Sequence, residues 1–247
     1  MFARYVALGD STTEGLDDPD GRGGYRGWAD RLAERLGGHY ANLGVRGKIT
    51  AAIKAEQLAP AVAMRPDLAT VVAGMNDLLR RDFDADRVAG DIGEMQRALI
   101  AAGAVVVSFT IPDLSRRIPI RGPLPARTQA LNRALRAIAK ATGARLLDLA
   151  QYDVASDPRL WAIDRLHANP AGHARIADAV AHVLGLPGAT AAWRVPLSTP
   201  VPPARLAEDL AWAWRYVVPW LWRRARGRTA GDRVTAKRPA LAPVERG

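Results

Sequence analysis

The 247-residue sequence contains no cysteine. This absence excludes disulfide bonds, zinc–thiolate sites and thiol nucleophiles. The sequence also has no apolar run near the ~20 residues that a membrane-spanning helix needs. Its N-terminus leads into the short apolar segment Tyr5–Leu8 without the hydrophobic region and cleavage site of a secretory signal. We therefore expect a cytoplasmic protein and leave open a peripheral association with a membrane.

Acidic residues are scarce near the C-terminus. From Thr190 onward there are eleven lysines and arginines but four aspartates and glutamates, so this segment carries +7 of the total net charge of +10. A nucleic-acid enzyme would more naturally carry a basic stripe on its folded domain. The charge distribution therefore argues against nucleic acid as a partner.

Short apolar runs alternate with longer segments of helical periodicity, a pattern typical of βαβ units and a parallel sheet. The predicted strands are Arg4–Leu8, Tyr40–Leu43, Leu68–Ala73, Val105–Phe109 and Arg145–Leu147. The predicted helices between and after them are Trp28–Leu36, Thr50–Met64, Asp86–Ala102, Pro125–Ala141 and a helix capped by Asn169 that ends at Leu184. The sequence therefore predicts a three-layer α/β/α sandwich with a five-stranded parallel sheet.

The chain divides into four predicted segments. Residues 1–189 form the α/β domain, 190–203 a proline-rich linker, 204–226 an amphipathic helix rich in Trp and Arg, and 227–247 a basic tail that we expect to be disordered. Pro219 is expected to kink or break the amphipathic helix.

Ser11 lies in the segment Gly9–Gly15, directly after the first predicted strand. Ligands of open α/β sheets bind at the carboxyl ends of the strands, so this serine is placed where a site is expected. A hydroxyl there is reactive only if a base can take its proton. Taken alone, the segment equally fits a turn in which Asp10 or Ser11 caps the next element.

Asp164 and His167 follow the fifth predicted strand and return to the same edge of the sheet. An acid three residues before a histidine can accept a hydrogen bond from imidazole Nδ1, which leaves Nε2 as a base. An isolated pair of this kind is more simply a capping aspartate beside a surface histidine. The position after a strand favours a catalytic pair.

Two further loops offer hydrogen-bond donors to a developing oxyanion. Gly44 follows the second predicted strand and has a backbone N–H that no side chain shields. Asn76 follows the third strand and has a side-chain amide. Each residue alone also fits ordinary turn chemistry.

Together, the four motifs resemble those of the GDSL-type, or SGNH, hydrolases. They match as Gly9-Asp10-Ser11-x-Thr13-x-Gly15, Asn42-x-Gly44 with Gly47 and Thr50, Gly74-x-Asn76-Asp77, and Asp164-x-x-His167. The resemblance extends from residue 1 to about residue 186. No serine lies in the G-x-S-x-G motif of α/β-hydrolases.

The resemblance implies a flavodoxin-like fold and a serine ester hydrolase that needs no cofactor or metal. Under it, Ser11 is the nucleophile, His167 the general base and then acid, and Asp164 the residue that orients His167. The oxyanion hole consists of the Ser11 and Gly44 backbone N–H groups and the Asn76 amide. Asp10 and Asp77 have structural roles. The acidic run Asp17–Gly21 lacks the spacing of a calcium loop and is predicted to be a solvated turn.

The substrate stays open at this point. A small-molecule or lipid ester, cleaved by an esterase, lipase or lysophospholipase, is the main prediction. A carbohydrate or cell-wall O-acetyl ester is the alternative for the same residues. A non-catalytic membrane or nucleic-acid binding protein is disfavoured because all five site residues are present.

The Trp- and Arg-rich helix allows two interpretations. Its apolar residues, including Leu210 and Trp214, can cover a patch on the core or on a second subunit. Alternatively, tryptophans beside arginines suit contact with an anionic membrane surface.

Overall fold

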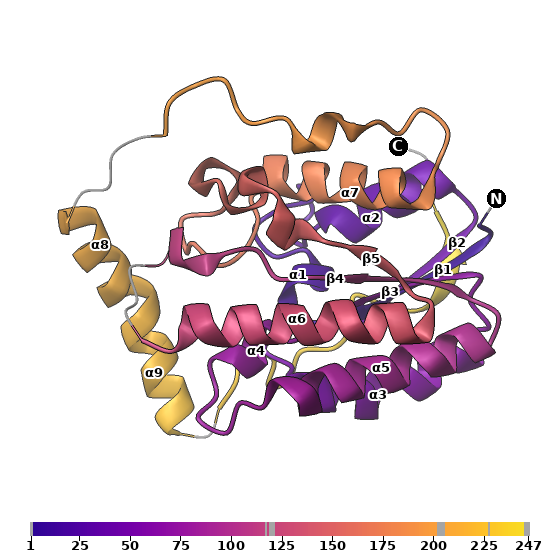
Figure 1. Cartoon of the computed structure of the whole chain (residues 1–247), viewed down its shortest axis with the longest axis horizontal. Helices are drawn as coiled ribbons and strands as arrows, with labels where there is room; N and C mark the ends of the chain where they lie inside the picture. The colour runs from indigo at the N-terminus through magenta and orange to yellow at the C-terminus, as the bar shows by residue number, and fades with distance from the viewer. Residues whose placement is uncertain (1, 117, 119–121, 202–205, 227, 245–247) are drawn as a thin grey trace.

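The computed structural model describes residues 2–116, 118, 122–201, 206–226 and 228–244. A six-stranded sheet lies between two layers of helices (Figure 1). The strands are β1 (Arg4–Gly9), β2 (His39–Asn42), β3 (Leu68–Val72), β4 (Val105–Phe109), β5 (Arg145–Leu147) and β6 (Arg238–Pro243). The α-helices are α1 (Ser11–Glu14), α2 (Gly27–Leu36), α3 (Thr50–Ala63), α4 (Met75–Leu78), α5 (Ala85–Ala101), α6 (Leu124–Thr142), α7 (Pro170–Leu184), α8 (Leu206–Trp212) and α9 (Val218–Ala225).

The strand order is β5-β4-β3-β1-β2-β6. Strands β1 to β5 are parallel and follow the flavodoxin-like order. The direction in which successive strands are added to the sheet reverses between β1 and β3, and ligands of such sheets bind at this point. The α/β fold class is thus confirmed.

The prediction of a five-stranded, purely parallel sheet is wrong, because β6 pairs antiparallel with β2 at the sheet edge. The prediction of disorder over 227–247 is wrong at Arg238–Pro243, which form β6. The sequence pattern did not predict this strand because it contains Pro239 and Pro243, and proline argues against a strand. An edge strand tolerates proline because one side of it makes no ladder hydrogen bonds. Residues 227 and 245–247 lie outside the described part of the chain.

Alternate residues of β1 point to opposite faces of the sheet, and both faces are covered. Val6 and Leu8 pack into the cluster formed with α3, α5 and α6. Tyr5 and Ala7 pack into the cluster formed with α2 and α7. Figure 1 shows these two helix layers on opposite sides of the strands. With both faces of the sheet occupied, a ligand can reach the central strands only at their ends.

The C-terminal helix is nearly continuous across α8 and α9. A π-helical segment, Ala213–Val217, joins them directly before Pro219. Proline lacks the N–H of a regular α-turn and crowds the preceding turn, and the wider π-turn accommodates it here. Pro219 therefore does not end the helix. Among the described helices, none is long and apolar enough to cross a membrane.

Two contacts anchor the segments that follow the α/β domain. Within the predicted linker, Trp193 lies in the short 3₁₀ helix Ala191–Arg194 and is buried against the core. Before β6, Lys237 Nζ donates to the carbonyl oxygens of Tyr25 and Arg26 and pairs with Asp30. The C-terminal part of the chain thus returns to the α/β domain.

Candidate active site

The turn between β1 and α1 fixes Ser11 at the carboxyl end of the central strand. A Cβ at Gly9 would lie 2.2 Å from Thr13 Oγ1 and 2.6 Å from the Val72 carbonyl oxygen, so only glycine fits this close approach. Asp10 is the N-cap of α1 and accepts from Thr12 N at 3.0 Å. Ser11 begins α1, where a backbone N–H has no intrahelical acceptor.

Ser11, His167 and Asp164 form a continuous hydrogen-bonded chain. His167 Nε2 lies 2.8 Å from Ser11 Oγ, and His167 Nδ1 lies 2.5 Å from Asp164 Oδ2. Ser11 is only 8% exposed, and all three residues line one cavity. With Nδ1–H donated to Asp164, Nε2 is the nitrogen that can accept the serine proton.

The loop that carries Asp164 and His167 is fastened at its base. Trp161 and Ala168 form an isolated antiparallel bridge, and Ala162 N donates to the His167 carbonyl oxygen at 2.8 Å. Asp164 Oδ1 accepts from the backbone N–H of Leu166 and of His167. Asn169 then caps α7, as the sequence predicts, by accepting from Gly172 N at 3.0 Å. These bonds hold the imidazole toward Ser11.

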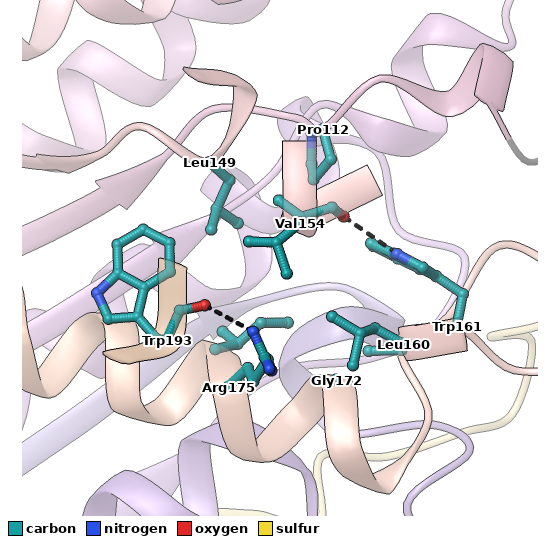
Figure 2. Close-up of a pocket in the computed structure, with 11 residues that line it drawn as sticks. Pro112, Leu149, Val154, Leu160, Trp161, Gly172, Arg175 and Trp193 are labelled. Atoms are coloured by element: carbon teal, nitrogen blue, oxygen red, sulfur yellow. Dashed lines mark hydrogen bonds between the residues drawn. The ribbon is translucent and has the colours of Figure 1, made fainter. Parts of the chain in front are cut away.

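Figure 2 shows a small apolar cavity beneath this loop, lined by Trp161, Leu160 and Trp193 among others. Trp161 Nε1 donates to the Ala155 carbonyl oxygen, and Arg175 donates to that of Trp193 (Figure 2). Its volume of about 30 Å³ matches a single water molecule. The cavity is therefore too small to bind a substrate.

His167 is held close to two carboxylates. Burial alone would lower its pKa, but hydrogen bonds and charge from Asp164 and Asp17 outweigh burial and raise the pKa to about 9. Burial likewise works to raise the pKa of Asp164, yet its bond to His167 keeps that pKa below the usual value. The pair thus favours the charged imidazolium in the free protein.

Asp17 is a residue that the sequence interpretation missed. Its Oδ2 lies 3.5 Å from His167 Nδ1, and its backbone has a positive φ of 65°. The predicted solvated turn is also wrong at Asp18, which is buried and pairs with Arg31. Pro19, Asp20 and Gly21 are exposed, as a solvated turn requires, and Asp20 accepts from the backbone N–H of Arg22 and Gly24.

Asp17, Asp164 and His167 also bring potential metal ligands within 4.8 Å of one another. Binding a cation there through Nδ1 would break the 2.5 Å bond between His167 and Asp164. The three residues can therefore either accept the proton of Ser11 or bind a metal ion, but not both at once.

Two of the three predicted oxyanion donors, Asn76 and Gly44, have other hydrogen-bond partners in this structure. Asn76 Nδ2 donates to Asp10 Oδ2 at 3.1 Å and to the Lys48 carbonyl oxygen at 2.9 Å, and Asn76 lines the cavity with Ser11. Gly44 N donates to Asn42 Oδ1 at 2.9 Å. Gly44 packs against α1, since a Cβ there would meet Glu14 N at 2.8 Å.

Asp10 and Asp77 make contacts that fit structural roles. Asp77 Oδ2 accepts from both the N–H and the hydroxyl of Thr50, which joins the loop after β3 to α3. Asp10 is fully buried between Thr12 and Asn76, and this burial raises its pKa to about 6. Asp10 thus fixes the start of α1, which carries Ser11, and Asp77 fixes α4, which carries Asn76.

Two further buried groups support the site and were not predicted. Glu14 pairs with the Arg46 guanidinium and accepts from Arg46 N, which ties α1 to the loop after β2. His173 accepts from Trp28 N and donates to the Leu16 carbonyl oxygen. Burial lowers the pKa of His173 to about 4, which keeps it neutral.

The C-terminal helix reaches the loop that carries Asp164 and His167. Trp212 Nε1 donates to the Asp164 carbonyl oxygen at 2.8 Å, and the Trp212 side chain is buried. Arg165 lies over the Trp212 ring and pairs with Asp209 at 2.6 Å. Helix α8 therefore clamps the turn between Asp164 and His167.

The cavity lined by Ser11, Asp164 and His167 has a volume of about 550 Å³, within the range of small-molecule sites. Most of its lining is apolar and comes from two sources. The α/β domain contributes Leu16, Ile49, Met75, Leu79, Leu114, Ile118, Leu124 and Leu166, and the C-terminal helix contributes Trp212, Tyr216, Val217 and Trp220. The C-terminal segment is thus part of the site.

Solved structures with the same fold are numerous. A variant of Axe2, an acetyl-xylooligosaccharide esterase from Geobacillus stearothermophilus, is 20% identical with a TM-score of 0.62, covering 76% of this chain and 97% of its own. TesA is 23% identical with a TM-score of 0.60, covering 73% and 97%. The psychrotrophic esterase EstA from Pseudoalteromonas sp. is 19% identical with a TM-score of 0.60, covering 74% and 97%.

At these identities the likeness establishes the fold. No curated protein sequence matches the chain. The sequence model of the GDSL-like Lipase/Acylhydrolase family, however, matches residues 7–175, which contain all four motifs and the hydrogen-bonded chain from Ser11 to Asp164. The chain belongs to the GDSL-like Lipase/Acylhydrolase family.

Proposed function

We propose that the protein hydrolyses carboxylic esters with an apolar acyl group, using Ser11, His167 and Asp164 as a catalytic triad. Membership of the family and the esterases among its structural neighbours support ester hydrolysis. The observation that carries the proposal is the pair of contacts that links Ser11 Oγ to His167 Nε2 and His167 Nδ1 to Asp164.

In the first half of the reaction, Ser11 Oγ attacks the ester carbonyl carbon while His167 Nε2 takes the hydroxyl proton. The tetrahedral intermediate collapses when His167 returns that proton to the departing alcohol, which leaves an acyl group on Ser11. In the second half, His167 takes a proton from water, which attacks the acyl carbonyl. His167 then returns that proton to Ser11 Oγ as the bond to the acyl group breaks and the acid leaves. Asp164 keeps Nδ1 protonated and stabilises the imidazolium formed in each half.

The Ser11 and Gly44 N–H groups and the Asn76 amide serve as oxyanion donors in this proposal. Asn76 must break its hydrogen bond to Asp10 or to the Lys48 carbonyl oxygen in order to donate to the substrate oxygen. Gly44 N must likewise break its hydrogen bond to Asn42 Oδ1. Rearrangement of this kind is expected, because catalytic hydrogen bonds often tighten only when substrate binds.

The lining of the cavity supports an apolar acyl group rather than an acetylated sugar. A sugar ring needs several polar partners. The lining contains Asn76, Thr229 and four arginines, but more than half of it, including Ile49, Met75 and Leu114, is apolar. Some structural neighbours are described as acetylxylan esterases. An O-acetyl carbohydrate is therefore retained as the alternative substrate for the same triad.

The test is hydrolysis of p-nitrophenyl esters from acetate to long acyl chains, beside acetylated xylan. We expect turnover to increase from acetate to medium chains and to be lost in Ser11→Ala. The matched control is Ser198→Ala, an exposed serine outside the cavity, which should retain full activity. Preference for acetylated xylan would establish the alternative, and turnover by Ser11→Ala would overturn the triad.

A further inference from the structure

The C-terminal helix is apolar on two sides. Trp212, Tyr216, Val217 and Trp220 line the cavity. A second set, here called the outer face, is exposed and consists of Leu206, Leu210, Trp214, Val218, Leu221 and Trp222. Steps of about four residues from Leu206 to Val218 place the outer face along one side of the helix.

The outer face is also unusual in how strongly its apolar side chains are exposed. Its six residues are among nine large apolar side chains that are markedly exposed in the described part of the chain, and Trp214 is 75% exposed. Figure 1 shows α8 and α9 at the left edge of the molecule, across the ends of α4 and α6. A contiguous exposed apolar surface of this kind marks an interaction site.

The surroundings of the outer face are basic. Residues 206–226 contain four arginines, all at or after position 215, and two acidic residues, Glu208 and Asp209, of which Asp209 pairs with Arg165. Arg226 lies 4.0 Å from the centroid of the Trp222 ring, and Arg215 lies 5.7 Å from that of Tyr216. Such contacts hold the guanidinium groups beside the aromatic rings without neutralising their charge. Arg223 and Arg228 continue this basic surface to the lining of the cavity.

We propose that the outer face docks on the surface of an anionic lipid bilayer. Tryptophan and leucine enter the boundary between headgroups and acyl chains, while flanking arginines contact anionic headgroups. A second copy of this chain is a poorer occupant. An antiparallel contact would set the arginines of one copy against Glu208 and Asp209 of the other, but Asp209 already pairs with Arg165, so the four arginines would outnumber the available carboxylates. Charge complementarity therefore selects the bilayer.

Docking in this orientation gives the cavity access to the bilayer. The outer face contacts the lipid, while the opposite side of the same helix forms the cavity wall beside Ser11. An ester with an apolar acyl chain can then pass from the bilayer into the cavity. This second step rests on the proposed function, whereas docking itself does not need catalysis.

The experiment measures binding of the full-length protein to sedimenting vesicles of phosphatidylcholine, with and without phosphatidylglycerol. We expect binding to the anionic vesicles. This binding should weaken between ~0.1 M and ~1 M salt, because the electrostatic screening length becomes shorter. Leu210→Ser/Trp214→Ser should weaken binding by about tenfold or more. Arg215→Glu/Arg226→Glu should weaken it by at least about twentyfold, at about fivefold per arginine. Turnover of a soluble p-nitrophenyl ester should not change in either variant.

Two control variants carry the same kinds of substitution, apolar to serine and arginine to glutamate, at positions outside the C-terminal helix. Val195→Ser replaces an exposed apolar residue outside the helix, and Arg133→Glu reverses an exposed charge on α6. Both should bind vesicles as the unmodified protein does. Ser11→Ala should also bind normally, so loss of catalysis and loss of docking are separate results.

Two results would overturn docking. One is equal binding to neutral and anionic vesicles that the outer-face variants do not weaken. The other is absence of vesicle binding together with a dimer that Leu210→Ser/Trp214→Ser dissociates, which would assign the outer face to a second copy.

Discussion

Asp17 places a second negative charge beside the imidazole of His167, and its removal should change the pH dependence of catalysis. The distance from Asp17 Oδ2 to His167 Nδ1 is 3.5 Å, and the Asp17 side chain is 42% exposed. Because of this exposure, the water dielectric is the appropriate one, and the interaction amounts to about 1 kcal/mol. That energy corresponds to just under one pH unit. Asp17→Asn should therefore lower the pKa of His167.

The sign of the effect on activity follows from the role of His167 as base. With a pKa of about 9 in the free protein, only about 1% of the imidazole is neutral at pH 7. Lowering the pKa by about 0.7 unit increases the neutral fraction by about fivefold. Since a weaker base is also a poorer proton acceptor, kcat/KM at pH 7 should rise, but by less than about fivefold.

The assay is the pH profile of kcat/KM for a soluble p-nitrophenyl ester, corrected for spontaneous hydrolysis. The unmodified protein should gain activity up to about pH 9, and Asp17→Asn should reach its plateau about 0.7 unit lower. The matched control is Asp86→Asn, an exposed carboxylate in the first turn of α5, which should leave the profile unchanged. An acid limb that stays in place in Asp17→Asn would refute the reasoning.

Three further predictions concern the residues around the triad. Asn76→Ala should lower kcat by about a hundred- to a thousandfold, the usual loss of one oxyanion donor, with unchanged circular dichroism; an unchanged kcat would remove Asn76 from the oxyanion hole. Trp212→Phe keeps the ring but loses the bond to the Asp164 carbonyl oxygen, so kcat/KM should fall by about two- to tenfold at unchanged KM; a change in KM alone would show that Trp212 only shapes the cavity. The pKa of His167 is raised from 6.5 to about 9 on folding, so its contribution to stability is complete below pH 6.5 and is lost as pH rises through about 9. Melting temperature should consequently fall less over that interval in His167→Gln than in the unmodified protein, and equal slopes would contradict the assigned pKa.

Local patterns were sufficient to predict the central sheet and its helices. The strands Val105–Phe109 and Arg145–Leu147 have the bounds that the sequence predicts, and the other three parallel strands differ at their ends by one residue. Buried parallel strands are continuous apolar runs, and helices of an α/β fold have clear ends at glycine or proline. The contacts of Asp164 and His167 also follow from short-range geometry within one loop.

Contacts between distant segments could not be predicted in the same way. β6 contains two prolines and pairs with a strand nearly two hundred residues earlier in the chain. Trp212 reaches the catalytic loop across 48 residues, and no local pattern distinguishes it from the exposed Trp214. The position of Asp17 beside His167 depends on a backbone with positive φ, which a non-glycine residue rarely adopts.

Identification of the nucleophile tests the central claim most directly. The full-length protein would be treated with an alkyl fluorophosphonate, which loses fluoride as its phosphorus bonds to an activated serine, and digested for mass spectrometry. We predict a single phosphonyl group on Ser11, loss of ester hydrolysis in proportion to labelling, and no labelling of His167→Gln on the same time scale. Complete labelling of another residue, or full ester hydrolysis by protein labelled at Ser11, would contradict the account.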